Sequence, residues 1–521
     1  MTEMPFTITG LPLSTLRASC VAGAIACLAM AGGTGGQDAG RAPSRAIPRT
    51  WDDDALRSME VPLAQPDVSP VYAPSAYYYR MPVRPIYRSY PVYRPDREPA
   101  GYFEGLAREE PEIVFDERTL TTEQAWIDAG RVVFAAPIEY ESSGQLYAGV
   151  RDRRWYERNQ VPVTGDGILP FMRYVVRQKG KVELGVLACA HCHTRVMPDG
   201  TTITGAQGNF PDDRSFAYEM RMDAGQARDP KEPLADVRRF VRRSYAAPWL
   251  APDPNAAPER MTLEEIAAVF EAIVPGVCAR QGSSPFFPPR IPDLIGVKDR
   301  RYLDASGLVR HRSIGDLMRY AALNQGADAL SLYGTFRPKG ADLPAPETQS
   351  RYSDAQLYAL SLFIYSLAPP PNPNAFDATA ARGKEVFERT GCATCHTPPL
   401  YTNNRLTPAV GFTVPPAHLA ADDVLRVAVG TDPRLTLQTR RGTGYYKVPS
   451  LKGVWYRGPF EHNGSVASLE DWFDSRRLRD DYAPTGFRGA GVRTRAVKGH
   501  AFGLNLSPAD RAALIAFLKT I

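Results

Sequence analysis

The sequence predicts an all-α fold in which two related helical domains follow one another along the chain. Two CxxCH motifs, at Cys189 and Cys392, each follow a segment that favours a helix. Each motif is followed, further along, by an amphipathic segment that predicts a helix closing its domain. A repeated segment, residues 291–297 and residues 448–454, lies between each motif and its closing helix.

Capping signals place helices at the ends of each predicted domain. A Thr or Ser followed by acidic residues can accept hydrogen bonds from the free N–H groups of a first helical turn, so it is typical of a helix start. Thr122 carries this signal in the first domain, and Ser353 begins its closing helix. In the second domain, residues 379–389 lead directly into Cys392, and Ser507, followed by Pro, begins the closing helix.

Composition divides the rest of the chain. Residues 34–110 do not have the pattern of a domain. The stretch at 71–99 is rich in Pro, Tyr and Arg and has no sustained helix or strand period, which indicates an extended arm or linker. Such an arm either wraps around the folded body or tethers it flexibly. The predicted segments are a signal peptide at 1–33, this arm at 34–110, a first domain with insertions at 111–368, a linker at 369–378 and a second domain at 379–521.

The bulk composition is that of a globular protein without a nucleic-acid partner. At 521 residues the chain is too long for one ordinary core. Its hydrophobic content of 44% and charged content of 23% lie in the range of soluble globular proteins. A net charge of +5 is slight for this length, and no dense Lys/Arg cluster stands beside a nucleic-acid motif.

The N-terminus predicts export. Arg17 precedes an apolar run, Ala18–Ala31, that ends in small residues and glycines. The run is too short and too rich in Gly for a comfortable membrane span, so a cleaved signal peptide is the preferred interpretation. An uncleaved anchor and a lipid anchor on Cys27 are the alternatives. No later segment could span a bilayer, and the predicted location is the periplasm or the extracellular space.

The cysteines beyond the leader form two pairs and one remainder. Cys189 with Cys192, and Cys392 with Cys395, are each followed at once by His. A disulfide framework would spread its cysteines more widely, so the pairing points to a cofactor. Cys278 is left over and is expected to be a buried free thiol.

A CxxCH motif is the attachment signal of c-type haem. Its two thiols form thioether bonds to the haem vinyl groups, and the adjacent His reaches the iron on the same face. A zinc site would need four ligands, and no second Cys/His cluster stands at a suitable spacing; a redox-active Cys pair would not need the His twice. The sequence therefore predicts two covalently bound haem c groups. The predicted iron ligands and thioether residues are His193, His396, Cys189, Cys192, Cys392 and Cys395.

The sixth ligand of the second haem can be narrowed by elimination. The chain has no Met beyond Met318, so this haem cannot take the usual Met from its own domain. Of His418, His462 and His500, the last stands shortly before the closing helix, where cytochrome c domains place the distal-ligand loop. His500 is therefore the predicted distal ligand. Two His ligands lack the thioether that raises the potential, so this haem is expected to be comparatively reducing.

The first haem has no such partner in the sequence. No His lies between Thr194 and Arg310, and neither His nor Met lies between Arg319 and the closing helix. The remaining candidates are His311, Met197, Met220, Met222, Met261 and Met318. An iron without a strong sixth ligand can bind dioxygen or peroxide, which makes this haem the candidate reactive centre. A Met-ligated carrier haem is the alternative.

The loop after the first motif supplies candidate residues for the pocket of the first haem. Residues 205–211 contain Gln207 and Asn209, the polar side chains of this loop that are expected to touch a bound oxygen. In the repeat, a His follows each copy, His311 after the first and His462 after the second. We expect these two to shape the haem surroundings and the domain interface rather than to perform chemistry.

Two blocks in the second domain resemble a known superfamily. Residues 447–454 (KVPSLKGV) and 461–470 (EHNGSVASLE) are similar to the C-terminal domain of bacterial di-haem cytochrome c peroxidases. That superfamily includes peroxidases, di-haem enzymes that mature methylamine dehydrogenase, and di-haem rubber oxygenases. The resemblance covers residues 111–521 and is strongest after residue 379. It implies that the two helical domains are tandem cytochrome c-like domains.

The resemblance also bears on the iron ligands. Residues 496–504 (AVKGHAFGL) correspond to the loop that supplies the distal ligand of the C-terminal haem. Peroxidases usually have Met there, maturation enzymes Tyr and rubber oxygenases His, so His500 points toward the oxygenase branch. Family peroxidases carry a distal His in the loop after the first motif, whereas residues 205–211 contain none. The acid with which peroxidases break the O–O bond has no identifiable counterpart in the sequence.

The sequence therefore predicts an exported di-haem c-type cytochrome that acts as an oxidoreductase. The first haem would bind and activate dioxygen or peroxide. The second haem would exchange electrons with a redox partner protein or a small donor or acceptor. A cytochrome c peroxidase that reduces hydrogen peroxide and a non-catalytic electron carrier are the alternatives.

Overall fold

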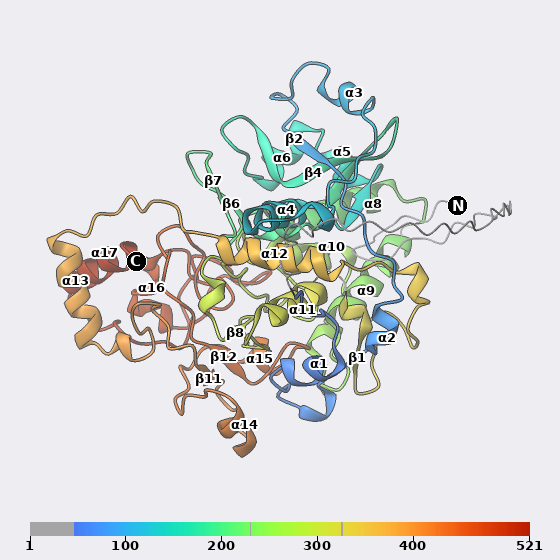
Figure 1. The fold of residues 1–521 in the computed structure, drawn as a ribbon. Helices are drawn as coiled ribbons and strands as arrows, with labels where there is room; N and C mark the ends of the chain where they lie inside the picture. The colour runs from blue at the N-terminus through green and yellow to red at the C-terminus, as the bar shows by residue number, and fades with distance from the viewer. Residues whose placement is uncertain (1–45, 230, 325–326) are drawn as a thin grey trace, which may run out of the picture.

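The computed structural model describes residues 46–521 except 230 and 325–326, and its elements are drawn in Figure 1. The expected signal peptide at 1–33 and the beginning of the expected arm lie outside these residues. Helix is the dominant secondary structure, as the sequence predicts, and strands form a minority.

The four helices that frame the predicted domains each begin at a side-chain cap. In each, a side-chain oxygen accepts a backbone N–H of the first turn that would otherwise lack a partner. The helices and their caps are α4 (Glu123–Ala135, cap Thr122), α12 (Asp354–Ser366, cap Ser353), α13 (Ala378–Arg389, cap Asp377) and α17 (Pro508–Lys519, cap Ser507). Three of these caps are the ones that the sequence predicts.

The framing helices cross in pairs, and a glycine lets the backbones touch at each crossing. A Cβ on Gly130 of α4 would overlap the carbonyl oxygen of Ala359 in α12. Gly383 of α13 stands against Ala513 of α17 in the same way. An edge-to-face aromatic pair flanks each crossing: Phe134 with Phe363, whose ring centroids are 5.3 Å apart, and Phe387 with Phe517, at 5.4 Å. The two halves of the chain therefore repeat one helix-crossing arrangement.

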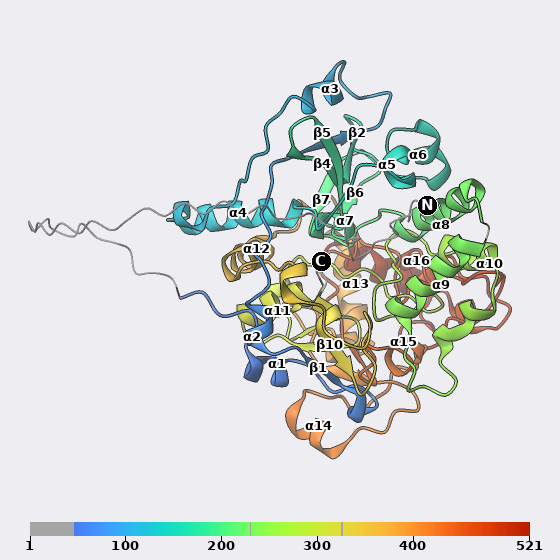
Figure 2. The same cartoon turned by 90° about the vertical axis from the view of Figure 1, so that its right-hand side faces the viewer.

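A four-stranded antiparallel sheet corrects the all-α prediction. Its strand order is β2 (Ser89–Tyr93), β4 (Ile168–Gln178), β5 (Lys181–Val186) and β3 (Glu139–Glu141). β4 and β5 form a hairpin whose apolar side chains are largely buried, and β2 pairs with β4 from far earlier in the chain. The sheet lies above α4 and α12 in both side views (Figure 1, Figure 2). The fold is mostly helical with an added sheet.

Three further helices form a smaller core in the first half of the chain. They are α8 (Asp212–Gln226), α9 (Lys231–Tyr245) and α10 (Leu263–Glu271). Met220, Val237 and Phe270 are buried between them, one from each helix. These helices lie between the first CxxCH motif and the first copy of the repeat, and they pack together beside the sheet (Figure 2).

The described part of the arm, from residue 46 to 110, packs onto the body. Trp51 is fully buried, stacks on Tyr78 with ring centroids 4.5 Å apart, and donates its indole N–H to the carbonyl of Ala73. β1 (Pro70–Tyr72) pairs with β10 (Ser331–Tyr333). The segment contains three short helices, α1 (Asp53–Met59), α2 (Ser75–Tyr78) and α3 (Tyr102–Leu106). Of the two alternatives for the arm, these residues follow the one that wraps the body.

Short elements complete the fold. The remaining helices are α5 (Gln145–Gly149), α6 (Arg153–Asn159), α7 (Cys189–Cys192), α11 (Ile314–Asn324), α14 (Pro416–Ala421), α15 (Arg434–Leu437) and α16 (Leu469–Trp472). The remaining strands pair as β6 (Thr194–Val196) with β7 (Thr202–Thr204), β8 (Tyr302–Leu303) with β9 (Val309–Arg310), and β11 (Leu406–Pro408) with β12 (Tyr445–Lys447).

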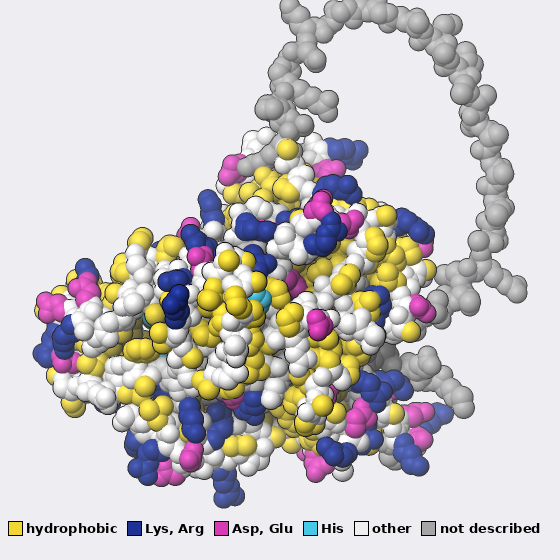
Figure 3. All heavy atoms as spheres, turned by 90° about the horizontal axis from the view of Figure 1, so that it is seen from below, with side chains coloured by type: hydrophobic (Ala, Val, Ile, Leu, Met, Phe, Trp, Pro, Cys, Tyr) yellow, Lys and Arg dark blue, Asp and Glu magenta, His cyan; other side chains and the backbone are white. Residues whose placement is uncertain are grey.

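The surface carries charges of both signs. On the face seen from below, Lys and Arg side chains are interspersed with Asp, Glu and hydrophobic side chains (Figure 3). Exposed ion pairs such as Arg88–Glu112, with an N···O distance of 2.6 Å, join some of these groups. Across residues 46–521, leaving out 230 and 325–326, no helix is long and apolar enough to cross a membrane.

Candidate haem sites

The first CxxCH motif lies directly after the sheet. The short helix α7 presents both cysteines after the end of β5, and His193 follows it. The Nδ1–H of His193 donates to the carbonyl oxygen of Pro292 over 3.1 Å. This bond leaves Nε2 as the free ring nitrogen, which is the usual arrangement of a metal-ligating His. Burial, and then the charge of Arg280, lowers the pKa of His193 to about 4, so the ring is neutral near physiological pH.

The second motif repeats this arrangement. A 3-10 helix over Cys392–Thr394 leads to His396. The Nδ1–H of His396 lies 3.1 Å from the carbonyl oxygen of Pro449 and 3.2 Å from that of Tyr401. Burial, and then the charge of His500, lowers the pKa of His396 to about 4. Both motifs therefore combine paired thiols with a neutral His whose Nε2 is free, which are the groups that a c-type haem requires.

The two proline acceptors occupy the same place in the internal repeat. Pro292 is the second residue of the copy at 291–297, and Pro449 is the second residue of the copy at 448–454. The repeat thus supplies the carbonyl that orients each motif histidine. Sequence reasoning found the repeat, but this role depends on a contact across about a hundred residues in the first half, which the sequence does not reveal.

An arginine stands at the same position after each copy of the repeat, and it hydrogen-bonds to the loop whose proline carbonyl accepts from the motif histidine. Arg300 donates to the carbonyl of Asp293, the residue after the first proline. Arg457 donates to the carbonyl of Ser450, the residue after the second proline, over 2.8 Å. A charged donor strengthens such a bond, so each arginine restrains the loop that holds its histidine.

Backbone conformation extends this register and corrects the pairing of His311 with His462. Asp304 and Glu461 stand at matching positions with φ of 69° and 72°, and a left-handed φ is uncommon for such residues. By the same register the counterpart of His462 is Ala305. His311 therefore follows the first copy without matching His462.

The structure brings His500 to His396. Their ring centroids lie 6.2 Å apart, with the ring planes inclined by 54°. An iron held by one nitrogen of each ring needs two bonds of about 2 Å, plus the distance from each nitrogen to its ring centre. The observed separation accommodates both. The rings of Trp472 and Phe502 pack edge-on against His500, at 5.2 and 5.3 Å.

A buried guanidinium holds the loop that carries His500. Arg477 is 1% exposed, and its terminal nitrogens donate to the carbonyls of Val497, Gly499 and His500 over 2.7, 2.9 and 2.8 Å. The Nε–H of Arg477 donates to the carbonyl of Trp472 over 2.9 Å. Because Arg477 belongs to another segment of the second half, sequence reasoning missed it. It positions the loop and leaves the His500 ring free to face His396.

The other four histidines bond to protein groups. His311 contacts the carbonyl of Arg300 at 2.7 Å and the Tyr365 hydroxyl at 2.6 Å, so both its ring nitrogens are used. The remaining pairs are His418 with the Tyr445 hydroxyl at 3.0 Å, His462 with the Thr431 hydroxyl at 2.9 Å, and His191 with Asp212 at 2.7 Å. Among the described residues, no ring contact joins any of these four to His193.

The polar residues expected to touch a bound oxygen at the first haem are engaged with the backbone. The Asn209 amide accepts from the N–H of Val196 over 3.0 Å and donates to its carbonyl over 2.8 Å. The buried Gln207 donates from Nε2 to the carbonyls of Gly276 and Pro459, over 3.0 and 3.1 Å. Oε1 of Gln207 has no partner among the described residues. Asn209 thus fixes its own loop, while Gln207 keeps one free acceptor.

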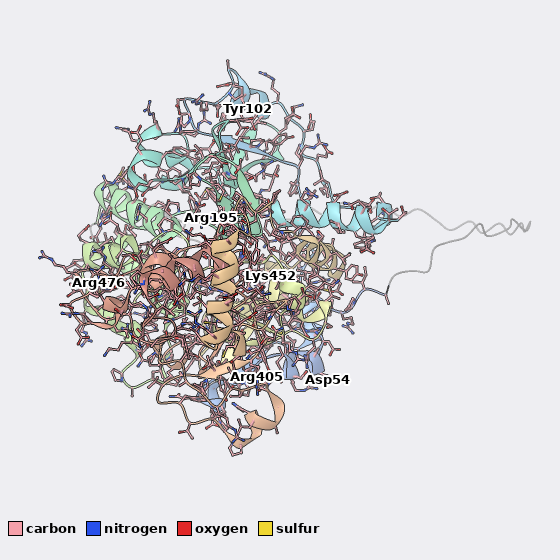
Figure 4. The ribbon with its side chains drawn as sticks, turned by 90° about the vertical axis from the view of Figure 1, so that its left-hand side faces the viewer. Asp54, Tyr102, Arg195, Arg405, Lys452 and Arg476 are labelled. Atoms are coloured by element: carbon pink, nitrogen blue, oxygen red, sulfur yellow. The ribbon has the colours of Figure 1, made fainter. Side chains whose placement is uncertain are left out.

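Arg195 ties the same loop to the second half of the chain. Its Nη1 donates to the carbonyl of Gly458 over 3.0 Å and to that of Gln207 over 3.3 Å. Figure 4 shows Arg195 where the sheet meets the helices of the second half. The loop after the first motif is therefore part of the contact between the two halves, a role that its sequence did not indicate.

Sequence reasoning also missed a buried acid held by two arginines. Oδ2 of Asp304 accepts from Arg280 and Arg441, both over 2.9 Å, and from the Tyr320 hydroxyl over 3.0 Å. Burial opposes ionisation, but the charges of the two arginines hold the pKa of Asp304 well below its usual range. Asp304 therefore anchors Arg280 as a carboxylate. Its register with Glu461 was the signal that could have revealed it.

Comparisons with known proteins agree with the motifs. No protein-family model matches the chain. The cytochrome-c peroxidase IdrP1 of Denitromonas iodatirespirans is 32% identical over 119 residues, which are 19% of this chain and 31% of that protein. The match spans less than a third of the relative's length. It confirms a resemblance to cytochrome c peroxidases, which residues 447–470 indicate.

Two solved structures superpose on part of the chain. One is a hydrazine synthase of Kuenenia stuttgartiensis, with 16% identity and a TM-score of 0.27 over 55% of this chain and 87% of that chain. The other is a MauG-like protein associated with microbial copper homeostasis, with 16% identity and a TM-score of 0.28 over 56% and 88%. Superpositions this loose do not define a common fold.

Proposed function

We propose that this chain is an exported di-haem c-type oxidoreductase with two unequal haem sites. Dioxygen or peroxide is bound on the His193 side, and electrons enter or leave on the side of His396 and His500. The observation that supports this division is the ring of His500 opposite His396, at a centroid distance of 6.2 Å. His193 has no such partner ring among the described residues.

We further propose that residues 111–368 and 379–521 form two tandem cytochrome c-like domains joined by the linker at 369–378. The repeated crossing of Gly130 with Ala359 and of Gly383 with Ala513 supports a duplication. The repeated proline acceptors support it independently, because each serves one motif histidine. Export by a cleaved leader at 1–33, and a periplasmic or extracellular location, are part of the same proposal.

The chain's own residues prepare the two sites differently. A haem iron with a single protein ligand supplies an open position for a small oxidant. On the His193 side, the Pro292 carbonyl fixes the tautomer and raises the basicity of the imidazole. On the His396 side, Arg477 donates to the backbone carbonyl of His500 and so positions its imidazole, which would occupy the sixth coordination position of the iron there. Gln207, with its free buried Oε1, is the proposed polar contact of the open side, and Asn209 supports its loop.

Reduction of hydrogen peroxide is the second candidate function. The curated relative is a cytochrome-c peroxidase, which supports it. Peroxide cleavage needs a group that transfers a proton, and the sequence offers neither a distal His in the loop at 205–211 nor an identifiable counterpart of the acid that family peroxidases use. With His500 rather than Met as the distal residue, this favours the oxygenase-like function. A carrier whose first haem is capped by Met is the third candidate.

Covalent attachment is tested by haem staining on denaturing gels, after expression in a host that matures c-type cytochromes. Staining should persist when Cys189 and Cys192 are replaced by Ala, and also when Cys392 and Cys395 are replaced. It should vanish when both pairs are removed. A wild-type protein that never stains would remove the basis of the proposal.

The unequal ligation is tested by the electron paramagnetic resonance and optical spectra of the oxidised protein. One low-spin haem with two His ligands and one haem without a strong sixth ligand are expected. Two six-coordinate low-spin haems would instead identify an electron carrier. Turnover of hydrogen peroxide with a reduced donor, measured on the same sample, separates the peroxidase from the oxygenase-like enzyme.

A further inference from the structure

A small cavity lies between the two loops that hold the motif histidines. Its volume is about 40 Å³, and both Pro292 and Pro449 line it. These are the residues whose carbonyls accept from His193 and His396, so the cavity adjoins both proposed haem sites. The share of one water molecule in the liquid is about 30 Å³, so the cavity accepts a group of carboxylate size but not a porphyrin ring.

The walls of this cavity carry an excess of positive charge. Its charged lining residues are Arg290, Arg300, Lys447, Arg457 and Asp293. The single carboxylate is already used, because Asp293 accepts from the Tyr456 hydroxyl over 3.0 Å and lies 3.7 Å from a guanidinium nitrogen of Arg457. Four basic side chains thus line this cavity together with one acid; Arg290, Arg300 and Lys447 are partly buried, and Pro449 is exposed.

Three of the four cations have no ion pair among the described residues. Arg300 donates instead to the carbonyls of Asp293 and Ile295, whereas Arg290 and Lys447 have no such compensation. The Arg290 guanidinium has neither a hydrogen bond nor an ion pair among the residues that the structure describes. The Lys447 ammonium has a single long contact, 3.5 Å from the carbonyl of Tyr302. Burial lowers the pKa of Lys447 to about 7 and that of Arg290 to about 10. A partly buried cation without an anionic partner loses some of its hydration without compensation, so an anion bound beside Arg290 and Lys447 would be stabilised.

We propose that this cavity binds a propionate carboxylate of a bound haem, with Arg290 as its principal partner and Lys447 and Arg457 beside it. The inference rests on the proposed function, because it requires haem at the two motifs. Its ligand is a carboxylate by charge and size, and a haem is the source that the adjoining histidines bring to the cavity. A mobile anion from solution is the other source of the same chemistry.

The four cations also act on both irons at once. Positive charge beside a haem stabilises the reduced iron relative to the oxidised iron, because reduction removes one positive charge. The cluster therefore raises both reduction potentials and partly offsets the lowering that two His ligands cause on the His396 side. Since one cluster serves both sites, loss of a cation should shift both potentials in the same direction.

The test uses the full-length holoprotein with haem propionates labelled isotopically through δ-aminolevulinate. Arg290→Gln removes the charge, Arg290→Lys retains it, and Lys452→Gln is the matched control. Lys452 lies on the same loop as Pro449 but is exposed, and it is labelled in Figure 4. Redox-difference infrared spectra report the propionate bands, and a spectroelectrochemical titration reports both midpoint potentials.

Arg290→Gln should shift a labelled propionate band and lower both midpoint potentials. Arg290→Lys should restore most of the band position and of both potentials. Lys452→Gln should change the band and the potentials least. Unchanged bands and potentials in an Arg290→Gln protein that still stains for two haems would overturn this inference and leave the proposed function intact. Wild-type potentials that move with added acetate or chloride, with no band shift in the variant, would assign the cavity to a free anion and also overturn it. Absence of covalent haem in the wild type would overturn both proposals.

Discussion

The carbonyl oxygen of Ala513 fills the space in which a side chain on Gly383 would stand. The two residues mark the crossing of α13 and α17, and no rotamer change relieves the overlap because the obstructing atom belongs to the backbone. We predict that Gly383→Ala destabilises the protein by about 1–3 kcal/mol or more, although Ala is the better helix former. Urea unfolding followed by helical circular dichroism measures the change.

A glycine in a helix without such a neighbour provides the control. Gly225 lies in α8, and nothing stands within 4 Å of the position that its Cβ would take. Gly225→Ala should therefore leave stability unchanged or raise it by up to about 1 kcal/mol. Equal effects of the two substitutions would contradict the packing explanation.

The framing helices could be predicted because their signals are local. Thr122, Ser353 and Ser507 cap helices through bonds to residues three positions away, and such bonds depend little on the rest of the fold. The sheet could not be predicted in the same way. Tyr90 of β2 pairs with Tyr174 of β4, although the whole of α4 lies between these two residues in the sequence. The segment around Tyr90 is rich in Pro and Tyr, so the sequence suggested an arm there instead of a strand.

In the candidate site too, roles that follow from the sequence alone could be predicted, whereas roles that depend on contacts between distant segments could not. His500 could be proposed from the sequence because the second half holds no Met and few histidines, so elimination was effective. Arg477 and Asp304 could not, since their roles lie in contacts with segments distant in the chain. Gln207 and Asn209 were selected for polarity, and their amides turn to backbone groups that only the folded chain brings near.

The His500 ring can be tested through two substitutions with opposite outcomes. His500→Ala removes the second imidazole, so one low-spin haem should become high-spin in the optical and electron paramagnetic resonance spectra. His500→Met offers a thioether instead, so the haem should stay low-spin while its reduction potential rises. Both variants keep the guanidinium of Arg477, which contacts the backbone carbonyl of residue 500.

His418→Ala is the control for this pair. His418 contacts the Tyr445 hydroxyl at 3.0 Å and lies in α14, apart from the closing helix. Its removal should leave both haem spectra unchanged. A spectrum that changes in His418→Ala or His462→Ala, and not in His500→Ala, would move the ligand role to that residue.

Glu461 should make stability depend on pH in the acid range. Burial raises the pKa of this carboxyl, but the charge of His462 and the hydrogen bonds from His462 and Thr431 outweigh it and lower the pKa from 4.5 to about 2. A carboxyl with a depressed pKa stabilises the fold above its unfolded-state pKa and loses that contribution as the pH falls through the folded-state value. Glu461→Gln should therefore cost about 3 kcal/mol at neutral pH.

The pH series distinguishes this effect from a general loss of packing. The difference between wild type and Glu461→Gln should shrink as the pH falls from 4.5 toward 2, when measured by urea unfolding. Glu470→Gln is the control, because Glu470 pairs with Lys519 at the exposed surface and such pairs contribute roughly 0–1 kcal/mol. A cost for Glu461→Gln that stays constant across this range would exclude the electrostatic explanation.

Carbon monoxide should bind one haem of the reduced protein and not the other. The His396 side has a second imidazole in place, so a small molecule must displace a bond before it can bind there. On the His193 side, no histidine ring stands opposite among the described residues, and a ligand meets no such barrier. A titration should perturb about half of the haem absorbance, at one molecule per chain.

The His500→Ala variant supplies the internal calibration, because it opens the second position. Its stoichiometry should rise to two per chain, with the remaining half of the absorbance now responding. If wild type binds none, the His193 side is capped by another ligand, most simply one of the buried methionines such as Met318, and the chain is an electron carrier. If wild type binds two, His500 is a weak ligand, and the proposed division between a reactive side and an electron-transfer side is wrong.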